Sequence, residues 1–337
     1  MSGHAPKGDD AIRQTNDDAT ISRLSAANLG YFHDPFVKYF VRRPSSNERR
    51  RSPLMNWGTY LRVTGLDELV DRFLGISVAD EQDPSSSNAI ETAKQILVLG
   101  AGSDTRWWRL KERGKQPAQY FEIDFPEITS LKIASIKKNE QLSRSLGTID
   151  ISSGGAELHS QAFHILPGDL RTFHPSITDA LVKSGFNKDI PTLILSECVL
   201  VYLDPSRGDS IISWCSENLR RAVFVTYEQI LPDDVFGRMM LRNLQSRGVD
   251  LRGIKEYPDL ASQVARYISL GWDESFSVNL NDFYNSSVSS SEKKRLTAIE
   301  ALDELEEWRM LLQHYCFVWA WLDRSKSGFT FRSFKQL

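Results

Sequence analysis

Glycine and acidic residues stand where four predicted strands end, and together they could bind a nucleoside. Apolar runs typical of strands buried in a parallel sheet lie at 95–99, 119–124, 163–166 and 192–197. The residues at or just beyond their ends are Gly100, Asp124, Asp169 and Glu197. Because open α/β sheets bind ligands outside the carboxyl ends of their strands, we expect these four positions to form one site.

The first of these ends is a glycine turn, Gly100-Ala101-Gly102, which precedes a predicted helix over 104–113. A strand, a glycine turn and a helix in this order are typical of the start of a nucleotide-binding unit. Asp124 follows the turn by about 20 residues, the separation at which a carboxylate meets a ribose diol. Thr105 replaces the third glycine of the dinucleotide-binding pattern.

This arrangement suits any ligand that contains adenosine, so NAD, FAD and S-adenosyl-L-methionine all remain candidates. A dinucleotide would place its pyrophosphate at the start of the helix. Asp104 stands at that point, where its negative charge opposes a phosphate. S-adenosyl-L-methionine has no phosphate and carries a sulfonium, and the turn therefore favours it.

Composition restricts the class of protein. The chain has 337 residues, a net charge of −3 and 41% hydrophobic residues, which suffices for a large core and argues against a general nucleic-acid-binding protein. Three cysteines lie far apart and no histidines have metal-ligand spacing, so we expect no metal site and a reducing, cytoplasmic location. No apolar run is long enough to span a membrane.

The alternation of strand and helix patterns over 95–230 predicts an α/β fold. We expect a disordered tail at 1–18, an N-terminal helical segment that covers the site at 19–94, a core with substrate-binding additions at 95–323 and a polar tail at 324–337. A helix predicted at 233–248 has an apolar stripe of Phe236, Met239, Met240 and Leu244, which we interpret mainly as core packing.

Several motifs in order make the chain similar to a known family. They are Gly30-Tyr31-x-x-Asp34-Pro35, Tyr60-Leu61-Arg62, Leu99-Gly100-Ala101-Gly102-Ser103-Asp104-Thr105, Phe121-Glu122-Ile123-Asp124-Phe125-Pro126, Ser196-Glu197-Cys198-Val199-Leu200-Val201-Tyr202 and Phe236-Gly237-x-Met239-Met240. From about Ser22 to Trp321, the chain resembles the leucine carboxyl methyltransferases, as a fungal-like member. The resemblance implies a class I S-adenosylmethionine-dependent methyltransferase core, Rossmann-like, with an N-terminal helical lid and additional C-terminal helices and strands.

The resemblance also implies roles for single residues. Arg23, where the family usually has lysine, and Arg62 match residues near the cofactor's carboxylate. Glu197 matches the acid at its amino group, and Asp124 matches the ribose acid, with Glu122 as a weaker candidate. The remaining matches are Gly100 at the turn, Asp169 and Leu170 at the adenine, and Tyr202, with Arg62, on the substrate side.

The family's reaction is methylation of the C-terminal leucine carboxylate of the protein phosphatase 2A catalytic subunit, with S-adenosyl-L-homocysteine as the second product. The substrate's α-carboxyl has a pKa of about 3.5 and is ionised at neutral pH, so the transfer needs no general base. We therefore expect positioning and exclusion of water to dominate catalysis. The implied partner is the C-terminal tail of the phosphatase, with no nucleic acid, no membrane and a monomeric enzyme.

Three other functions remain open. A related branch of carboxyl methyltransferases acts on a modified tRNA base, although the acidic net charge disfavours this. An NAD-dependent oxidoreductase would require a turn that accepts pyrophosphate. A phosphatase-binding protein without catalytic activity would not need the complete set of cofactor positions that the sequence contains.

Overall fold

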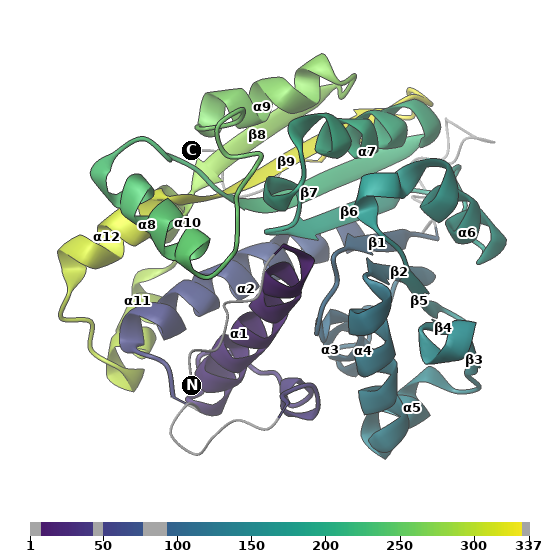
Figure 1. The fold of residues 1–337 in the computed structure, drawn as a ribbon, viewed down its shortest axis with the longest axis horizontal. Helices are drawn as coiled ribbons and strands as arrows, with labels where there is room; N and C mark the ends of the chain where they lie inside the picture. Colours follow the sequence, from purple (N-terminus) through teal and green to yellow (C-terminus); the bar gives the residue numbers. More distant parts are fainter. Residues whose placement is uncertain (1–7, 43–49, 77–92, 332–337) are drawn as a thin grey trace.

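A mixed sheet organises the chain in the computed structural model, which describes residues 8–42, 50–76 and 93–331 (Figure 1). Within these residues the sheet has nine strands, in the order β3-β4-β5-β2-β1-β6-β7-β9-β8. The strands are β1 (Gln95–Leu99), β2 (Gln119–Asp124), β3 (Asp150–Ser152), β4 (Glu157–His159), β5 (Phe163–Pro167), β6 (Thr192–Glu197), β7 (Arg221–Gln229), β8 (Glu274–Asn279) and β9 (Tyr315–Asp323).

Strands β5, β2, β1, β6 and β7 are parallel, whereas β9 is antiparallel to both of its neighbours, β7 and β8. The chain crosses from one half of the sheet to the other between β1 and β6. This is the topological switch point of a doubly wound sheet, where ligands bind. The arrangement confirms the predicted Rossmann-like core, and β3 and β4 form the hairpin that extends its edge.

The helices alternate with these strands and cover both faces of the sheet. They are α1 (Asp9–Asn28), α2 (Pro53–Leu74), α3 (Arg106–Glu112), α4 (Pro126–Lys138), α5 (Glu140–Leu146), α6 (Thr178–Lys183), α7 (Pro205–Asn218), α8 (Val235–Ser246), α9 (Leu260–Ser269), α10 (Leu280–Ser287), α11 (Ser290–Ile299) and α12 (Leu305–Gln313). Short helical turns are η1 (Val37–Tyr39), η2 (Ser153–Gly155), η3 (Leu170–Thr172), η4 (Phe173–Ile177) and η5 (Leu200–Tyr202).

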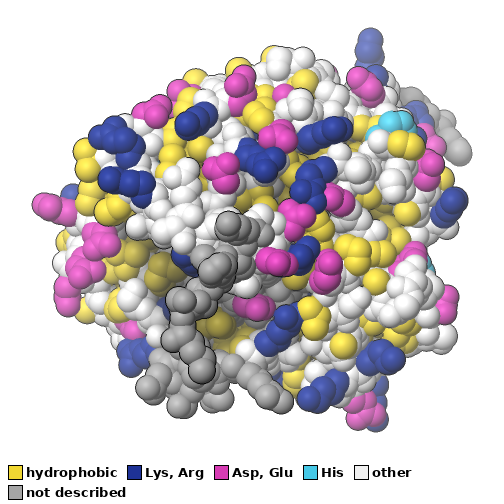
Figure 2. Space-filling view, viewed as in Figure 1, with side chains coloured by type: hydrophobic (Ala, Val, Ile, Leu, Met, Phe, Trp, Pro, Cys, Tyr) yellow, Lys and Arg dark blue, Asp and Glu magenta, His cyan; other side chains and the backbone are white. Residues whose placement is uncertain are grey.

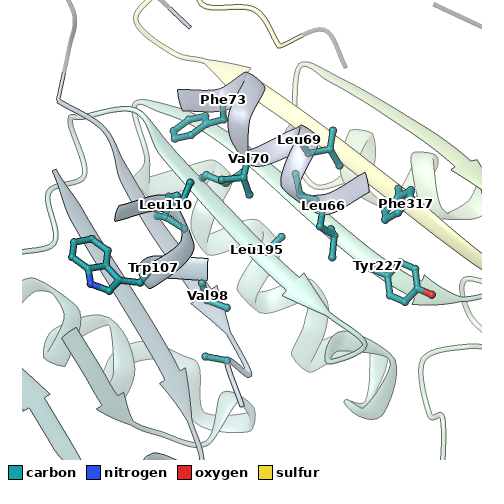
Figure 3. Close-up of a cluster of buried hydrophobic side chains, with 14 of the residues drawn as sticks. Leu66, Leu69, Val70, Phe73, Val98, Trp107, Leu110, Leu195, Tyr227 and Phe317 are labelled. Atoms are coloured by element: carbon teal, nitrogen blue, oxygen red, sulfur yellow. The ribbon is translucent and has the colours of Figure 1, made fainter. Parts of the chain in front are cut away.

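Successive residues of the central strands point to opposite faces, so each strand contributes to two cores. On β1, Ile96 and Val98 join the core beneath α2, whereas Leu97 and Leu99 join the core beneath α7 and α9. Figure 3 shows the first core, where apolar side chains of α2 and α3 pack against those of the sheet. This packing fixes α2, and therefore its polar face, relative to the strand ends.

Two predicted tails are wrong where the structure describes them. Residues 9–18, predicted to be disordered, form the first half of α1, because Ala11 packs in a small core with Val201 and Leu251 while polar neighbours face a cavity. The predicted polar tail at 324–337 contributes Phe329 and Phe331 to the main core. Residues 1–7, 43–49, 77–92 and 332–337 lie outside the described residues, so parts of both predicted tails and of the predicted 19–94 segment do too.

The interpretation of the α8 stripe as core packing is only partly right. Met240 and Leu244 are half-buried against the small core that contains Ala11. Met239 is 47% exposed, and Gly237 is the only fully buried residue of the helix. Helix α8 lies at the periphery rather than on a sheet face, so one side of it faces solvent (Figure 1). None of the helices in the described ranges is both long and apolar enough to cross a membrane.

Candidate active site

A cavity of about 730 Å³ lies at the carboxyl ends of the parallel strands. Its wall combines the strand ends with α1, α2, the segment around η5, the chain after α8 and the end of α12. Helix α1 packs beside α2 and crosses this end of the molecule (Figure 1). The eight main candidates from the sequence all line the cavity: Arg23, Arg62, Gly100, Asp124, Asp169, Leu170, Glu197 and Tyr202.

The turn after β1 brings backbone close to the ligand space. Gly100 and Gly102 have φ angles of +64° and +49°, which favour glycine. A Cβ atom on Gly100 would lie 2.5 Å from a methyl group of Val199, and one on Gly102 would lie 2.4 Å from Oδ1 of Asn16. The Ser103 N–H donates to the same Asn16 oxygen at 2.9 Å, so α1 is tied directly to the turn.

Asp124 faces the same turn from the end of β2. Its Oδ2 accepts the Gly102 N–H and its Oδ1 accepts the Phe125 N–H, both at 2.7 Å. Burial raises the pKa of this carboxyl, and the two amides only partly offset that effect. Each carboxylate oxygen keeps a second lone pair, which can accept a hydrogen bond from a ribose hydroxyl.

Glu197 lies between two arginines at the end of β6. Arg62 of α2 donates through Nε to Oε2 at 3.0 Å, and Arg106 of α3 donates through Nη2 to Oε1 at 2.8 Å. Burial opposes ionisation of Glu197, but the two guanidinium groups outweigh it and hold the pKa below its usual value. The carboxylate is therefore ionised at neutral pH and can attract an ammonium group.

Arg23 of α1 supplies a further cationic group to the cavity wall. Its Nε donates to Asp34 at 2.6 Å, and its Nη2 is buried without a hydrogen-bond partner among the described residues. A buried donor without a partner is costly, so this atom is well suited to a ligand oxygen. Arg23 and Arg62 both line the cavity and together can neutralise a ligand carboxylate.

Asp169 and Leu170 form the wall after β5. Both carboxylate oxygens of Asp169 accept from Nε of Arg171 at 2.9 Å. Arg171 also donates to Asp9 at the start of α1, at 2.8 Å, and it holds the pKa of Asp169 below its usual value against the effect of burial. The backbone and the apolar Leu170 side chain are therefore the groups of this segment most available to a planar base.

Aromatic and apolar side chains form the rest of the wall. Tyr227 of β7 stacks on Tyr315 of β9, with ring centroids 5.4 Å apart, and the Arg62 guanidinium lies 5.2 Å from the Tyr227 ring. Tyr202 reaches the cavity from η5. Apolar residues complete this part of the wall, among them Leu280, Leu311 and Leu312.

Two inferences about acidic residues need correction. The Asp104 carboxylate forms an ion pair with Arg106 at 2.5 Å and is largely buried, so its charge is compensated and does not by itself oppose a phosphate. Glu122 does not line the cavity. It is buried within the sheet, where it pairs with Lys132 at 2.5 Å, and burial raises its pKa to about 8.

Asn16 and Arg106 also contact the groups of this site, although neither was predicted from the sequence. Asn16 lies in a polar stretch that lacks a motif. Arg106 was hidden because it follows the turn in a mixed segment of charges and tryptophans. It is 1% exposed and contacts Asp67, Asp104 and Glu197. The available signal was a basic residue two positions after Asp104, at the start of the helix that follows the glycine turn.

Comparisons with known proteins agree with the resemblance that the sequence motifs indicate. The family model described as leucine carboxyl methyltransferase matches residues 11–216. The leucine carboxyl methyltransferase 1 homolog of Arabidopsis thaliana is 39% identical over 311 residues, which cover 92% of this chain and 89% of that protein. The chain belongs to the leucine carboxyl methyltransferase family.

Two further members are similar over nearly the whole chain. Leucine carboxyl methyltransferase 1 of Emericella nidulans is 38% identical and that of Rattus norvegicus 35%, each covering 93% of this chain and 85% and 90% of those proteins. The tRNA wybutosine-synthesizing protein 4 of Rattus norvegicus is 34% identical over 90% of this chain, which spans only 43% of that protein.

The family makes this chain an S-adenosyl-L-methionine-dependent leucine carboxyl methyltransferase with a class I methyltransferase fold. The cavity fits the cofactor chemically. It presents carboxylates for hydroxyl and ammonium groups, a buried guanidinium donor for a carboxylate, and a glycine turn whose Gly100 and Gly102 line its wall. This cofactor supplies a methyl group activated by a sulfonium, and S-adenosyl-L-homocysteine is its product.

Proposed function

We propose that the protein methylates the α-carboxylate of the C-terminal leucine of the protein phosphatase 2A catalytic subunit. The observation that carries the proposal is a single cavity with two chemically different parts. One part holds the acids and arginines around the glycine turn, and the other holds tyrosines and leucines. A zwitterionic cofactor suits the first part, and a leucine side chain with its carboxylate suits the second.

Each cofactor group has a matching protein group. We assign the ribose to Asp124, the ammonium group to Glu197, and the cofactor's carboxylate to Arg23 and Arg62. The adenine lies against Leu170 and the Asp169 backbone, with the Gly100 backbone beneath the cofactor. The contacts of Asp124 and Glu197 and the unpartnered Arg23 Nη2 atom support these assignments.

On the substrate side, Tyr202 and Arg62 orient the leucine carboxylate. Arg62 is 28% exposed and is shared between Glu197 and the tyrosine wall, so it can neutralise charge on either side. The leucine side chain lies among Leu280, Leu311 and Leu312. Because the carboxylate is already ionised at neutral pH, these residues contribute positioning and exclusion of water rather than proton transfer.

The alternative is transfer to a carboxyl group of a modified tRNA base. The similarity to tRNA wybutosine-synthesizing protein 4 motivates it. The face in Figure 2 argues for the protein substrate, since Lys and Arg side chains alternate there with Asp and Glu. Nucleic-acid-binding proteins usually gather basic residues on one face.

The proposal also includes the oligomeric state, the cellular location and the partners of the enzyme. We infer that the enzyme is a monomer. The cysteines of the described residues, Cys198, Cys215 and Cys316, are free thiols, which supports a cytoplasmic location. We infer no membrane or nucleic-acid partner.

The test is methyl transfer from labelled S-adenosyl-L-methionine to the intact phosphatase catalytic subunit. A phosphatase that lacks only its C-terminal leucine is the matched control. We expect label on the complete protein alone, in a linkage that mild base removes as expected for an ester. Label on modified tRNA, and none on the phosphatase, would establish the alternative instead.

A further inference from the structure

A buried carboxyl group lies beneath the loop that carries two of the assigned residues. Glu228 is on β7 and is 2% exposed. The loop above it leaves β6 at Glu197 and continues through η5 to Tyr202. The Leu200 N–H donates to Oε1 of Glu228 at 3.2 Å. A single carboxylate thus contacts the segment between the acid assigned to the cofactor and the tyrosine assigned to the substrate.

The loop needs such an anchor because its backbone is unusual. Cys198 has a φ of +54°, a conformation that non-glycine residues rarely adopt. Its N–H donates to the Tyr227 carbonyl at 2.7 Å, and the Val201 carbonyl accepts the Gly253 N–H at 2.9 Å. The first amides of a helical turn have no partner within the turn. The Glu228 carboxylate provides an acceptor for them.

The surroundings of Glu228 make its charge sensitive to pH. Burial raises its pKa to about 7, while Arg266 and the amides of residues 199–201 act in the opposite direction. Its Oε2 atom is buried without a hydrogen-bond partner within the described part of the chain. The other titratable groups that face it are Tyr267 of α9, Cys198 and Tyr202 of the loop, and Cys316 of β9.

We propose that Glu228 is a positioning residue whose carboxylate fixes the loop from Glu197 to Tyr202 and so aligns the cofactor and substrate sides of the cavity. The carboxylate accepts hydrogen bonds from amides more strongly than the neutral acid does. Loss of its charge therefore loosens the loop. The part that concerns Tyr202 rests on the proposed function, whereas the part that concerns Glu197 and cofactor binding does not.

This role predicts a pH dependence that the transfer chemistry does not. The substrate carboxyl is ionised well below neutrality, so it does not titrate near pH 7. We expect cofactor affinity and kcat/KM to rise about fivefold as pH increases from 6 to 8, because Glu228 loses its proton over this interval.

The experiment measures S-adenosyl-L-homocysteine binding by calorimetry and kcat/KM for phosphatase methylation between pH 5.5 and 9. The variants are Glu228→Gln, which keeps an amide-accepting oxygen without titrating, and Glu122→Gln, a matched control that removes another buried carboxyl of raised pKa. Thermal unfolding at each pH reports whether each variant is folded. We expect the cofactor affinity and kcat/KM of E228Q to be independent of pH near pH 7. In E122Q, both quantities should still increase with pH.

A second variant identifies the titrating group if E228Q does not fold. The variant Arg266→Gln keeps the carboxyl groups of Glu228 and Glu122. It removes a cation that favours ionised Glu228, so the increase in cofactor affinity and kcat/KM should occur at higher pH. An unchanged rise in E228Q, or in R266Q, overturns the proposal. Cofactor binding could depend on pH as expected while no form of the enzyme, the natural protein included, methylates the phosphatase. The proposed substrate would then be wrong, and the role of Glu228 in the cofactor site would stand.

Discussion

At the scale of residues, the site consists of ion pairs whose members are shared. Arg106 contacts three carboxylates, of which only Glu197 and Asp104 reach the cavity wall. Arg109, one helical turn further along α3, pairs with Asp67 and lies near Asp34. Arg106 therefore contacts acids that line the cavity, whereas the acids beside Arg109 do not line it.

The variant Arg106→Lys should lower cofactor affinity about tenfold, equivalent to about 1.4 kcal/mol. Lysine keeps the charge but cannot contact several carboxylates through a planar fork, so Glu197 loses part of its support. Calorimetry with S-adenosyl-L-homocysteine measures the effect. Arg109→Lys is the control and should change affinity less than about twofold. Equal losses in both variants would show that Arg106 acts only through general stability.

Two histidines lie opposite each other on the neighbouring strands β4 and β5. His164 of β5 is buried, and its Nδ1 lies 3.0 Å from Nδ1 of His159. Burial, with a smaller contribution from His159, lowers the pKa of His164 to about 4. The unfolded chain takes up a proton near pH 6.5, so the stability that this group contributes is present above that pH and is lost as pH falls toward 4.

His164→Gln should therefore reduce the loss of unfolding free energy between pH 7 and pH 5 by about 2 kcal/mol. Urea unfolding at both pH values measures the difference. His33→Gln is the control for the chemical change, because it makes the same substitution at a mostly exposed histidine. The same pH dependence in H164Q and in the natural protein would contradict this account of His164.

At the scale of elements, α2 determines where Arg62 lies. The helix rests on the sheet through Leu66, Leu69 and Phe73 (Figure 3). It approaches closely at Gly65, where a Cβ atom would lie 2.4 Å from the Phe317 ring. Gly58 of the same helix is different, since a Cβ atom there would have its nearest neighbour at 4.0 Å.

Gly65→Ala should destabilise the protein by about 1–3 kcal/mol, because the added methyl group pushes α2 away from the sheet. Cofactor affinity should also fall, since Arg62 moves with the helix. Gly58→Ala makes the same chemical change where space is available and should be neutral or stabilising by about 0.5–1 kcal/mol. Denaturant unfolding measures the change in stability of both variants. A neutral effect of G65A would show that the helix can shift without cost.

At the scale of the molecule, α1 closes the cavity over the sheet. Its side chains contact four distant segments: Asp9 meets Arg171, Asn16 meets the glycine turn, and Asp18 meets both Arg51 and Arg247. Most of its buried residues lie in its second half, which packs on α2. The first half therefore contributes more to the cavity than to the core.

Deletion of residues 1–18 should lower cofactor affinity at least tenfold while the sheet remains folded. Deletion of residues 1–7 is the control and should preserve affinity, because the contacts of α1 begin at Asp9. Calorimetry measures binding, and circular dichroism measures the fold. Full affinity in the longer deletion would mean that α1 does not enclose the cofactor.

The sequence determined the alternation of strands and helices and the residues at the strand ends. These are local properties, because apolar runs, glycine turns and strand-end acids are adjacent in the chain. Gly100, Asp124 and Glu197 could therefore be chosen in advance, and the family motifs added Arg23 and Arg62.

Only the tertiary structure decided which charges meet. Arg106 pairs with Asp67 and Glu197, which are far away in the sequence, as well as with its near neighbour Asp104. Likewise, the polar start of α1 is ordered because it lies over the cavity, although its composition predicts disorder. Coulomb interactions and burial depend on distance in space, which the order of residues does not specify.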